Sequence, residues 1–406
     1  VEIRGTGSYI PEKIVDNREL EQMVETTDVW IRERTGICRR HIAEKETVVD
    51  MGVQAAMQAL EHSGISAKEI DLLIVSTLSA ETVMPSVSCR IQERIGAVRA
   101  VCFDLNAACS GFLLAYQSAE AYLESGAYKT ALIIGSERLS NIIGWKDRNS
   151  CILFGDGAGA VVLTCTEKKG YRFISHSDGS MGNALMLEHH YDRNLETEQH
   201  RLSIEQSASS KVSMDGQAGF LFSVGRVIEE VLCINGLSRE EIDCYVLHQA
   251  NQRIVEAVAK RLKEPLGKFP MNLQNYGNTS SASIPILLNE LDQSKRLKTG
   301  DRIVMAGFGG GLTWVHLSQN GFKKVKRRFF IMFEEIKAIV AENLGADKAS
   351  ITPETSFSED LKADSLDLFE MVMAFEEHFG VDIPAEDLEQ LKTVGDVMSY
   401  VESHKA

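Results

Sequence analysis

The stretch SGISAKEIDLLIVST, residues 63–77, returns as NGLSREEIDCYVLHQ at residues 235–249, with Gly, Ser, Glu, Ile and Asp at matching places. Each copy ends an amphipathic helical pattern with a glycine, Gly64 or Gly236, and then continues into an apolar strand. The two predicted helices cover residues 48–62 and 219–234. The stretch is therefore a helix–strand unit that occurs twice.

A second matching pair follows in the same order. FGDGAGAVVL occupies residues 154–163, and FGGGLTWVHL occupies residues 308–317. Chance explains one matching segment more easily than two segments in the same order. We therefore predict an α/β protein of two duplicated halves, about residues 1–165 and 166–322.

Charge divides the chain further. The 406 residues are 44% apolar, which is enough for a large core and more than one domain. From Phe329 onward the chain holds 18 Asp and Glu but 5 Lys and Arg, which gives this end −13 of the total charge of −15. This distribution argues against nucleic acid as a partner and favours a basic protein surface as the partner of the acidic end.

Targeting and metal-binding patterns are absent from the sequence. No apolar run approaches the roughly 20 residues that span a bilayer, and Val1 begins in strand-like sequence without a signal-peptide pattern. We therefore expect a cytoplasmic protein without membrane association. The eight cysteines form no CxxC pair and lie near no histidine cluster, so neither a metal site nor disulfides are expected, and most cysteines are predicted to be inert core thiols.

One cysteine has a special position. Within residues 100–126, AVCFDLNAACSGFLLAYQSAEAYLESG, Cys109 stands where a strand pattern turns into a helix pattern. The equivalent position in the second copy, 172 residues later, is Ser281, in GNTSSASIPILLNEL, which is another loop that opens a helix. We expect the two helix starts to face each other near a pseudo-twofold axis, with His248 and Asn278 beside them.

Each of these residues also has an ordinary interpretation. A lone cysteine is usually a small buried hydrophobe, and His248 and Asn278 could be a strand-end and a turn residue. However, the backbone N–H groups and the dipole at a helix start stabilise a thiolate. We therefore expect Cys109 to have a lowered pKa and to act as a nucleophile, with the same N–H groups forming half of an oxyanion hole.

Four motifs then occur in one order: ACSG around Cys109, HQANQRI around His248, GNTSSAS around Asn278, and the terminal GFGGGLTW. Together they resemble the β-ketoacyl-acyl carrier protein synthase III family of the thiolase fold, and the likeness runs from IRGTGSYIPE to about residue 320. The resemblance implies a Cys-His-Asn site. It also implies the priming condensation of fatty-acid synthesis, because Asn278 stands where the elongating synthases carry a second histidine.

The resemblance implies a reaction in two steps. Cys109 takes an acyl group from an acyl-CoA, while the N–H groups of Cys109 and Gly310 hold the oxyanion. Malonyl-acyl carrier protein then loses carbon dioxide, and His248 and Asn278 donate hydrogen bonds to the enolate, whose carbon attacks the acyl group. No metal or redox cofactor is implied.

Further residues are assigned by the same resemblance. Positions matching Trp30, Arg148 and Arg253 stack on or pair with the CoA nucleotide. Met84, in SAETVMPSVSC, corresponds to a wall of the acyl pocket, and its flexible side chain predicts that short straight or branched primers beyond acetyl are accepted. Phe308 is a further expected substrate contact, and a homodimer is the expected assembly. Any one of these residues could otherwise be an ordinary surface or core residue.

The acidic end carries three amphipathic helical patterns, over residues 333–345, 365–380 and 393–406, which predict a small all-α bundle. Ser365, in ADSLDL, could simply cap a helix. The whole tail, however, resembles an acyl carrier protein, whose Asp-Ser-Leu serine carries 4′-phosphopantetheine added by a phosphopantetheinyl transferase. Lys362 is a departure, because carriers commonly have Gly there.

The joint between the domains contains KKVKRR, residues 323–328, within a predicted linker of residues 323–331, so that the carrier domain is expected at residues 332–406. Met332 stands where an independent carrier would start, and residues 327–331 could be encoded by AGGAGG and an AT-rich spacer. We hypothesise that the linker is a translated intergenic segment with an old ribosome-binding site. An engineered fusion is the alternative.

The carrier is expected to dock beside the active-site entrance. Arg253, Lys260 and Arg261 lie at i, i+7 and i+8, on one helix face, whereas Asp364, Asp367, Glu370 and Glu377 follow the helix that Ser365 opens. A linker of about ten residues spans at most ~33 Å, so delivery within the chain and across a dimer both stay open. Two solvated charged faces are the alternative.

Two other function classes stay open. One is a related thiolase-fold enzyme of secondary metabolism or lipid synthesis that uses a nucleophile other than malonyl. The second is a non-catalytic carrier-binding scaffold, against which the intact Cys-His-Asn set argues.

Overall fold

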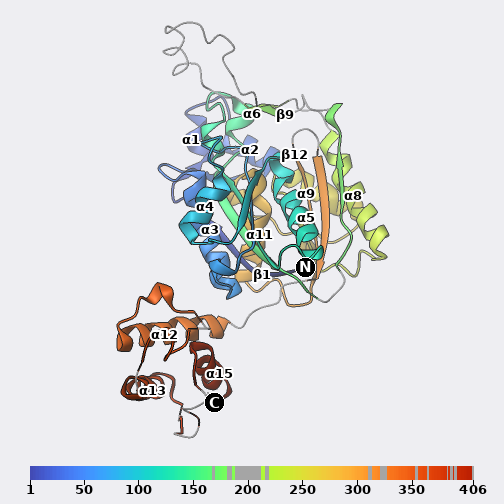
Figure 1. Cartoon of the computed structure of the whole chain (residues 1–406). Coiled ribbons are helices and arrows are strands. Elements are labelled where there is room, and N and C mark those ends of the chain that lie inside the picture. Colours follow the sequence, from blue (N-terminus) through green and yellow to red (C-terminus); the bar gives the residue numbers. More distant parts are fainter. Residues whose placement is uncertain are drawn as a thin grey trace. The chain divides into compact units, whose positions relative to one another are not determined.

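The computed structural model divides the chain into two compact units, Val1–Lys324 and Val325–Ala406, each described by itself. Figure 1 shows both in the colours of the sequence. The structure describes residues 1–166, 170–180, 185–187, 212–214, 219–309, 313–320, 327–352, 355–363, 365–381, 383–384, 387 and 391–404.

The first half of the larger unit is built on a five-stranded sheet. In spatial order its strands are β1 (Glu2–Tyr9), β7 (Gly157–Thr164), β6 (Thr130–Glu137), β4 (Leu72–Ser76) and β5 (Val101–Leu105). The pairs β4–β5 and β4–β6 are parallel, and the pairs β6–β7 and β1–β7 are antiparallel. The edge strand β5 leads into the segment that carries Cys109.

The second half repeats this arrangement. Its sheet has the order β11 (Cys244–Leu247), β12 (Arg302–Gly309), β13 (Thr313–Asn320) and β8 (Ile174–Ser177), with β11–β12 parallel and the other pairs antiparallel. β11 and β12 begin 172 residues after β4 and β6. The order β4–β6–β7–β1 therefore recurs as β11–β12–β13–β8, and the predicted duplication of α/β halves is confirmed.

The helices complete a five-layer unit. The helices α5 (Gly111–Glu124) and α11 (Ser283–Gln293) pack between the two sheets, while α3 (Val48–Ser63) and α8 (Gly219–Asn235) pack on their outer faces (Figure 1). Strand side chains alternate between faces, so in β4 Leu72 and Ile74 belong to the central core, whereas Leu73 and Val75 belong to the core under α3.

The larger unit also has smaller elements. They are β2 (Ile14–Asp16), α1 (Asn17–Glu21), α2 (Asp28–Thr35), β3 (Arg39–His41), α4 (Val87–Ile95), α6 (Arg148–Cys151), β9 (Leu185–Leu187), β10 (Val212–Met214), α9 (Gln252–Leu262) and α10 (Leu273–Tyr276). Of these, α4 packs beside α3 and α9 packs beside α8. Two 3-10 turns, η2 (Ala108–Ser110) and η6 (Ser280–Ala282), precede α5 and α11.

The smaller unit is a helical bundle of α12 (Arg327–Leu344), α13 (Ser365–Phe379) and α15 (Val394–His404). The three helices share one core, in which Ile336, Val340, Phe375, Val394 and Val401 are fully buried. The helical character predicted for the tail is confirmed.

The boundary between the units falls inside residues 323–331. The smaller unit begins at Val325, and α12 begins at Arg327, so the described part of this segment is helical. Among the described residues, no helix has both the length and the apolar character needed to cross a membrane.

Candidate active site

Two turns of the same uncommon conformation meet in the larger unit. Ala108 has φ +47° and Ser280 has φ +49°, which is the left-handed region, and the two residues stand at equivalent places of the repeat. Each begins a 3-10 turn, η2 or η6, that continues into α5 or α11, and the two turns contact each other. Backbone strain of this kind is maintained by its surroundings and is concentrated at functional sites.

Cys109 follows the first of these turns. It is buried, and it lines a cavity of about 570 Å³. The cavity wall is largely apolar, with Leu139, Ile143 and Phe154 among its residues, and Ser280 reaches it from the opposite turn. The cavity can therefore hold an apolar group attached to the Cys109 sulfur.

Burial raises the pKa of the Cys109 thiol to about 12. Hydrogen bonding from Ser280 lowers this pKa, while the Glu137 carboxylate raises it. The lowered pKa expected from the helix start is therefore wrong for the unacylated site. The reason is that both halves enclose the turn, so loss of solvation outweighs the favourable N–H groups.

His248 lies directly after β11 and is buried. Its Nδ1 lies 2.6 Å from the Ser283 Oγ, and the same oxygen accepts the Gln249 backbone N–H at 3.3 Å. With one acceptor position used, the hydroxyl can donate its proton to Nδ1, which places the ring hydrogen on Nε2. Burial lowers the pKa of His248 to about 3, so the ring is neutral. Nε2 is buried and has no hydrogen-bond partner among the described residues.

Asn278 is held by both its backbone and its side chain. Its N–H donates to the Leu153 oxygen at 2.8 Å, its carbonyl accepts from the Gly155 N–H at 3.1 Å, and its Oδ1 accepts from the Ser280 N–H at 2.8 Å. Since Oδ1 faces a donor, the amide orientation is fixed and Nδ2 is left as the donor end of the side chain.

Strand β12 brings these groups together. A side chain on Gly309 would place its Cβ 3.0 Å from the Cys109 nitrogen, and one on Gly307 would place its Cβ 3.4 Å from the His248 Cβ. Two residues that are two apart on a strand share one face, so Cys109 and His248 lie beside the same face of β12. The predicted oxyanion residue Gly310 lies outside the described residues. Because Gly309 has no side chain, strand β12 can approach the Cys109 N–H closely. Gly309 was not among the predicted site residues.

Phe308, predicted as a substrate contact, packs against the histidine instead of lining the cavity. Its ring meets the His248 ring edge to face, with 5.5 Å between ring centroids. It is therefore placed to hold the His248 ring, and it is absent from the wall of the cavity at Cys109.

Arg40 was not found by sequence reasoning. It is completely buried, donates from Nη2 to the Ile152 oxygen at 2.8 Å and from Nη1 to the Asn17 Oδ1 at 2.9 Å, and its Cβ lies against Gly277. Burial lowers its pKa to about 10, which still leaves it charged at neutral pH. Arg40 therefore supports the two segments between which Asn278 is held. It was not predicted because RRH in the sequence resembles any exposed basic run.

Glu137 joins the two halves beneath the cavity. It is buried at the end of β6 and lies 2.9 Å from the Ser281 Oγ and 2.5 Å from the Ser79 Oγ. Ser281 is the repeat counterpart of Cys109, and its hydroxyl also points to the Ser76 oxygen at 3.0 Å. This contact links the second helix start to the wall of the cavity in the first half.

The residues expected to bind CoA are partly assembled. Trp30 has the guanidinium of Arg148 and that of Arg34 each 4.8 Å from its ring centroid. An aromatic ring can offer a stacking surface to a nucleotide base, and guanidinium groups beside it can pair with phosphates. Arg253 is exposed on α9.

Met84 does not line the cavity of its own chain. Its side chain is 86% exposed, next to Val83 at 85%, whereas Thr82 and Val83 contribute to the cavity wall. The assignment of Met84 as a pocket wall is therefore not met within a single chain.

The basic face of α9 is smaller than expected. Arg261 lies 3.0 Å from the Glu229 carboxylate of α8, and Glu256 stands between Arg253 and Lys260 on their shared face. Arg253 and Lys260 are exposed, so two of the three predicted docking cations face solvent without a described ion pair. The opposing Asp364 lies outside the described residues.

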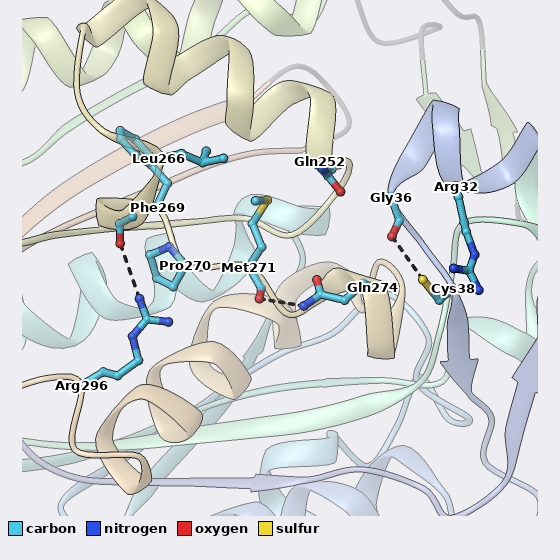
Figure 2. Close-up of a pocket in the computed structure, with 11 residues that line it drawn as sticks. Arg32, Gly36, Cys38, Gln252, Leu266, Phe269, Pro270, Met271, Gln274 and Arg296 are labelled. Carbon is cyan, nitrogen blue, oxygen red and sulfur yellow. Dashed lines mark hydrogen bonds between the residues drawn. The ribbon is translucent and has the colours of Figure 1, made fainter. Parts of the chain in front are cut away.

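A second cavity, of about 560 Å³, lies between the end of α2, the start of α9 and the segment 266–271 (Figure 2). In Figure 2, Arg32 and Cys38 stand on one side and Leu266 and Arg296 on the other. It contains none of the predicted site residues and is therefore separate from the cavity at Cys109.

Comparison with known proteins decides the family. Residues 103–182 and 232–318 match the family models described as 3-oxoacyl-[acyl-carrier-protein] synthase III and its C-terminal part. The β-ketoacyl-[acyl-carrier-protein] synthase III of Clostridium acetobutylicum is 48% identical over 318 residues, which cover 77% of this chain and 96% of that protein. The chain belongs to the 3-oxoacyl-[acyl-carrier-protein] synthase III family. It is therefore a condensing enzyme of the acyltransferase type, as the motifs predicted.

Solved structures agree with this synthase III assignment. The synthase III of Aquifex aeolicus has a TM-score of 0.71 at 40% identity and covers 78% of this chain and 98% of its own. The priming β-ketosynthase of the R1128 polyketide pathway has a TM-score of 0.74 at 34% identity and covers 80% of this chain and 96% of its own. The predicted thiolase-like fold is confirmed.

The synthase III unit is followed by a carrier-like unit. Residues 334–401 match the family model described as a phosphopantetheine attachment site. Ser365, the predicted attachment residue, lies within this match and is the first residue of α13. Lys362, three residues earlier, has φ +55°, which explains why glycine is common there.

Proposed function

We propose that the larger unit catalyses the priming condensation, in which an acyl-CoA and a malonyl-acyl carrier protein give a 3-oxoacyl-carrier, CoA and carbon dioxide. The observation that carries this proposal is the buried Nε2 of His248, which has no partner among the described residues, on a histidine that lies beside the same face of β12 as Cys109. A donor left unpaired in a buried site costs stability unless a ligand uses it.

In the first step the sulfur of Cys109 attacks the acyl carbonyl carbon of the acyl-CoA. The Cys109 S–H bond is lost, a new thioester forms at Cys109, the thioester of CoA breaks, and the proton leaves with the CoA sulfur. The Cys109 N–H, which lies against Gly309, is placed to donate to the oxyanion, and Gly310 is the proposed second donor.

In the second step the malonyl thioester loses carbon dioxide and becomes an enolate. The neutral His248 donates from Nε2, and Asn278 donates from Nδ2, to the enolate oxygen, so the developing charge meets two preorganised donors. The enolate carbon attacks the acyl carbonyl on Cys109, a carbon–carbon bond forms, and the Cys109 sulfur leaves as a thiolate and takes a proton from solvent.

Substrate access is proposed to follow the charged and aromatic residues at the surface. Trp30 and Arg148 are proposed to hold the CoA nucleotide, with Arg253 near the phosphates, because the first two already form a cation–π pair. The cavity of about 570 Å³ exceeds the needs of an acetyl group and supports primers such as butyryl or isobutyryl.

A cytoplasmic homodimer is proposed as the working form. Val83 and Met84 are almost fully exposed, and the edge strand β5 carries the half-exposed Val101. Apolar side chains and an unpaired strand edge at one place favour contact with another chain. In a dimer, Met84 could wall the acyl cavity of the partner, which would reconcile its exposure with its predicted role.

The carrier-like unit is proposed to be modified at Ser365 by a phosphopantetheinyl transferase. When bound, the 4′-phosphopantetheine group supplies a terminal thiol that carries acyl and malonyl groups as thioesters. Ser365 would hold the group at the start of α13, and Asp367 and Glu370 would present negative charge beside it to Arg253 and Lys260.

A second candidate is a priming reaction outside fatty-acid synthesis. It is favoured by the similarity to the R1128 priming β-ketosynthase. One experiment tests both: the intact mass of the chain is measured after incubation with acetyl-, butyryl- and isobutyryl-CoA, and malonyl-acyl carrier protein or another thioester is then added. The proposal expects acylation of Cys109 and a 3-oxoacyl product from malonyl carrier. Acylation without that product would refute the condensation with malonyl carrier.

A further inference from the structure

Ser280 has no role in the reaction described above, yet it occupies the same cavity as Cys109. Its backbone is held at φ +49°, a left-handed conformation that is strained for a residue with a side chain. Its hydroxyl is buried and has no well-aligned hydrogen-bond partner among the described residues. A buried hydroxyl without a partner, on a strained residue, indicates that a ligand or a reacting atom uses it.

The reacting atom beside it is the Cys109 sulfur. The turns η2 and η6 contact each other, and hydrogen bonding from Ser280 is the largest effect that favours the thiolate of Cys109. The Ser280 N–H is already used, because it donates to the Asn278 Oδ1 at 2.8 Å. The backbone of Ser280 thus serves the enolate donor, while its hydroxyl is available to the nucleophile.

We propose that Ser280 is a further catalytic residue, whose hydroxyl donates a hydrogen bond to the Cys109 sulfur whenever that sulfur is negatively charged. This occurs twice in a cycle: when the S–H proton departs during transfer of the acyl group from CoA, and when the carbon–sulfur bond breaks after condensation. The inference rests on the proposed function only for the identity of the acyl donor.

Other charges near the sulfur do not replace this donor. Glu137, from β6, opposes the thiolate. Asp104, from β5, lines the cavity but accepts the Val87 and Ser88 N–H groups of α4 at 2.7 and 2.8 Å. His248, after β11, is neutral. The Nε2 hydrogen of His248 and the Nδ2 hydrogens of Asn278 are assigned to the enolate oxygen in the second step. Among the described residues that line the cavity, the hydroxyls of Thr77 and Thr82 have partners, so the Ser280 hydroxyl is the one left to donate to the sulfur.

The test measures alkylation of Cys109 by iodoacetamide, in which the thiolate displaces iodide. The rate is followed on the Cys109 peptide by mass spectrometry between pH 7 and pH 10, so that other cysteines do not interfere. Ser280→Ala keeps the backbone strain and removes the hydroxyl. We expect its rate to be about tenfold lower at each pH, equivalent to an upward shift of about one pH unit.

Two matched variants separate chemistry from conformation. Ser280→Gly also removes the hydroxyl but relieves the strain at positive φ, and it should show the same loss as Ser280→Ala. Thr279→Val removes a hydroxyl from the preceding residue, which is equally buried, and should alkylate at the wild-type rate. A wild-type rate for Ser280→Ala would overturn the proposal, as would a loss in Ser280→Ala that Ser280→Gly restores.

The experiment is independent of acyl-CoA and malonyl carrier. A loss of alkylation in a chain that performs no condensation would keep the role of Ser280 and refute the proposed function. If the chain performs the condensation and both Ser280 variants are alkylated at the wild-type rate, the proposed function is kept and the role of Ser280 is refuted.

Discussion

The Nδ1 atom of His248 and the hydroxyl of Ser283 lie 2.6 Å apart, and their repeat counterparts in the first half are Ser76 and Gly111. In the first half the space is closed, because a side chain on Gly111 would collide with the Ser76 hydroxyl. The second half therefore has a histidine and its hydroxyl partner where the first has a serine against a glycine. The contact with Ser283 occupies Nδ1, so Nε2 is the nitrogen left for the site, and donation from the Ser283 hydroxyl to Nδ1 would keep the ring hydrogen on Nε2.

Replacing Ser283 with Ala should lower decarboxylation of the malonyl thioester by about tenfold, because the ring loses the partner that keeps the hydrogen on Nε2. Release of carbon dioxide measures this, and acylation by acyl-CoA should change little. In a His248→Ala background the same substitution should have no further effect. An equal loss in both backgrounds would show that Ser283 acts on folding and not through the ring.

Cys109→Ser should abolish acylation, since the alcohol at this position is far less acidic and less nucleophilic than the thiol. His248→Ala and Asn278→Ala should still acylate but lose at least about a hundredfold in decarboxylation, because each removes an enolate donor. Intact mass reports the first step and carbon dioxide release reports the second. Undiminished decarboxylation in the Asn278 variant would contradict its assignment.

The raised pKa of Cys109 gives a pH dependence with a definite sign. Because the folded pKa is about 12, the thiol is protonated at pH 7, and the thiolate fraction grows about tenfold with each pH unit up to that value. The rate of alkylation of Cys109 should therefore still be rising between pH 9 and pH 10. A plateau for Cys109 below pH 8 would show that the resting sulfur is already a thiolate.

Lys362→Gly should stabilise the carrier-like unit by about 0.5 to 1 kcal/mol. The lysine is held at φ +55°. The free energy gained by removing this backbone strain exceeds the free energy lost because glycine gives the unfolded chain more conformational entropy. Hydrogen exchange of α12 and α15 amides in the full-length protein measures the change. Lys392→Gly is the matched control, because Lys392 is exposed and is not among the residues with positive φ, so its replacement should destabilise.

Charge reversal on α9 should distinguish the exposed cations from the paired one. Arg253→Glu and Lys260→Glu should each slow turnover with malonyl carrier about threefold to tenfold at low salt, with a smaller effect at moderate salt. Arg261→Glu breaks the ion pair with Glu229 and should act mainly on stability. Carrier kinetics that are identical before and after reversal of Arg253 and Lys260 would exclude this face as the docking site.

Much of the fold follows from local sequence patterns. The repeated helix–glycine–strand unit predicts the duplication because α3 and α8 both end at glycines with positive φ, Gly64 and Gly236. The prediction that Cys109, His248 and Asn278 lie near one another rests on their places at the end of a strand or the start of a helix, because such ends share one edge of an α/β layer.

What depends on burial could not be predicted. The pKa of Cys109 is set by enclosure between two halves, which a motif does not reveal. Arg40 is buried although its neighbours in RRH are basic, because distant carbonyl groups receive its hydrogen bonds. The exposure of Met84 and the ion pair of Arg261 likewise depend on segments far away in sequence.

The turns at Ala108 and Ser280 belong to different copies of the repeated α/β unit. The proposed reaction uses residues from both copies. In the proposed reaction, the first copy supplies the nucleophile and the second supplies the histidine, the amide and the hydroxyl, so neither copy alone would hold a complete site. The Glu137–Ser281 contact joins the two copies, so the proposed site depends on how they are aligned. A shift of the copies by a fraction of an ångström would leave every element folded and still misalign the reacting atoms.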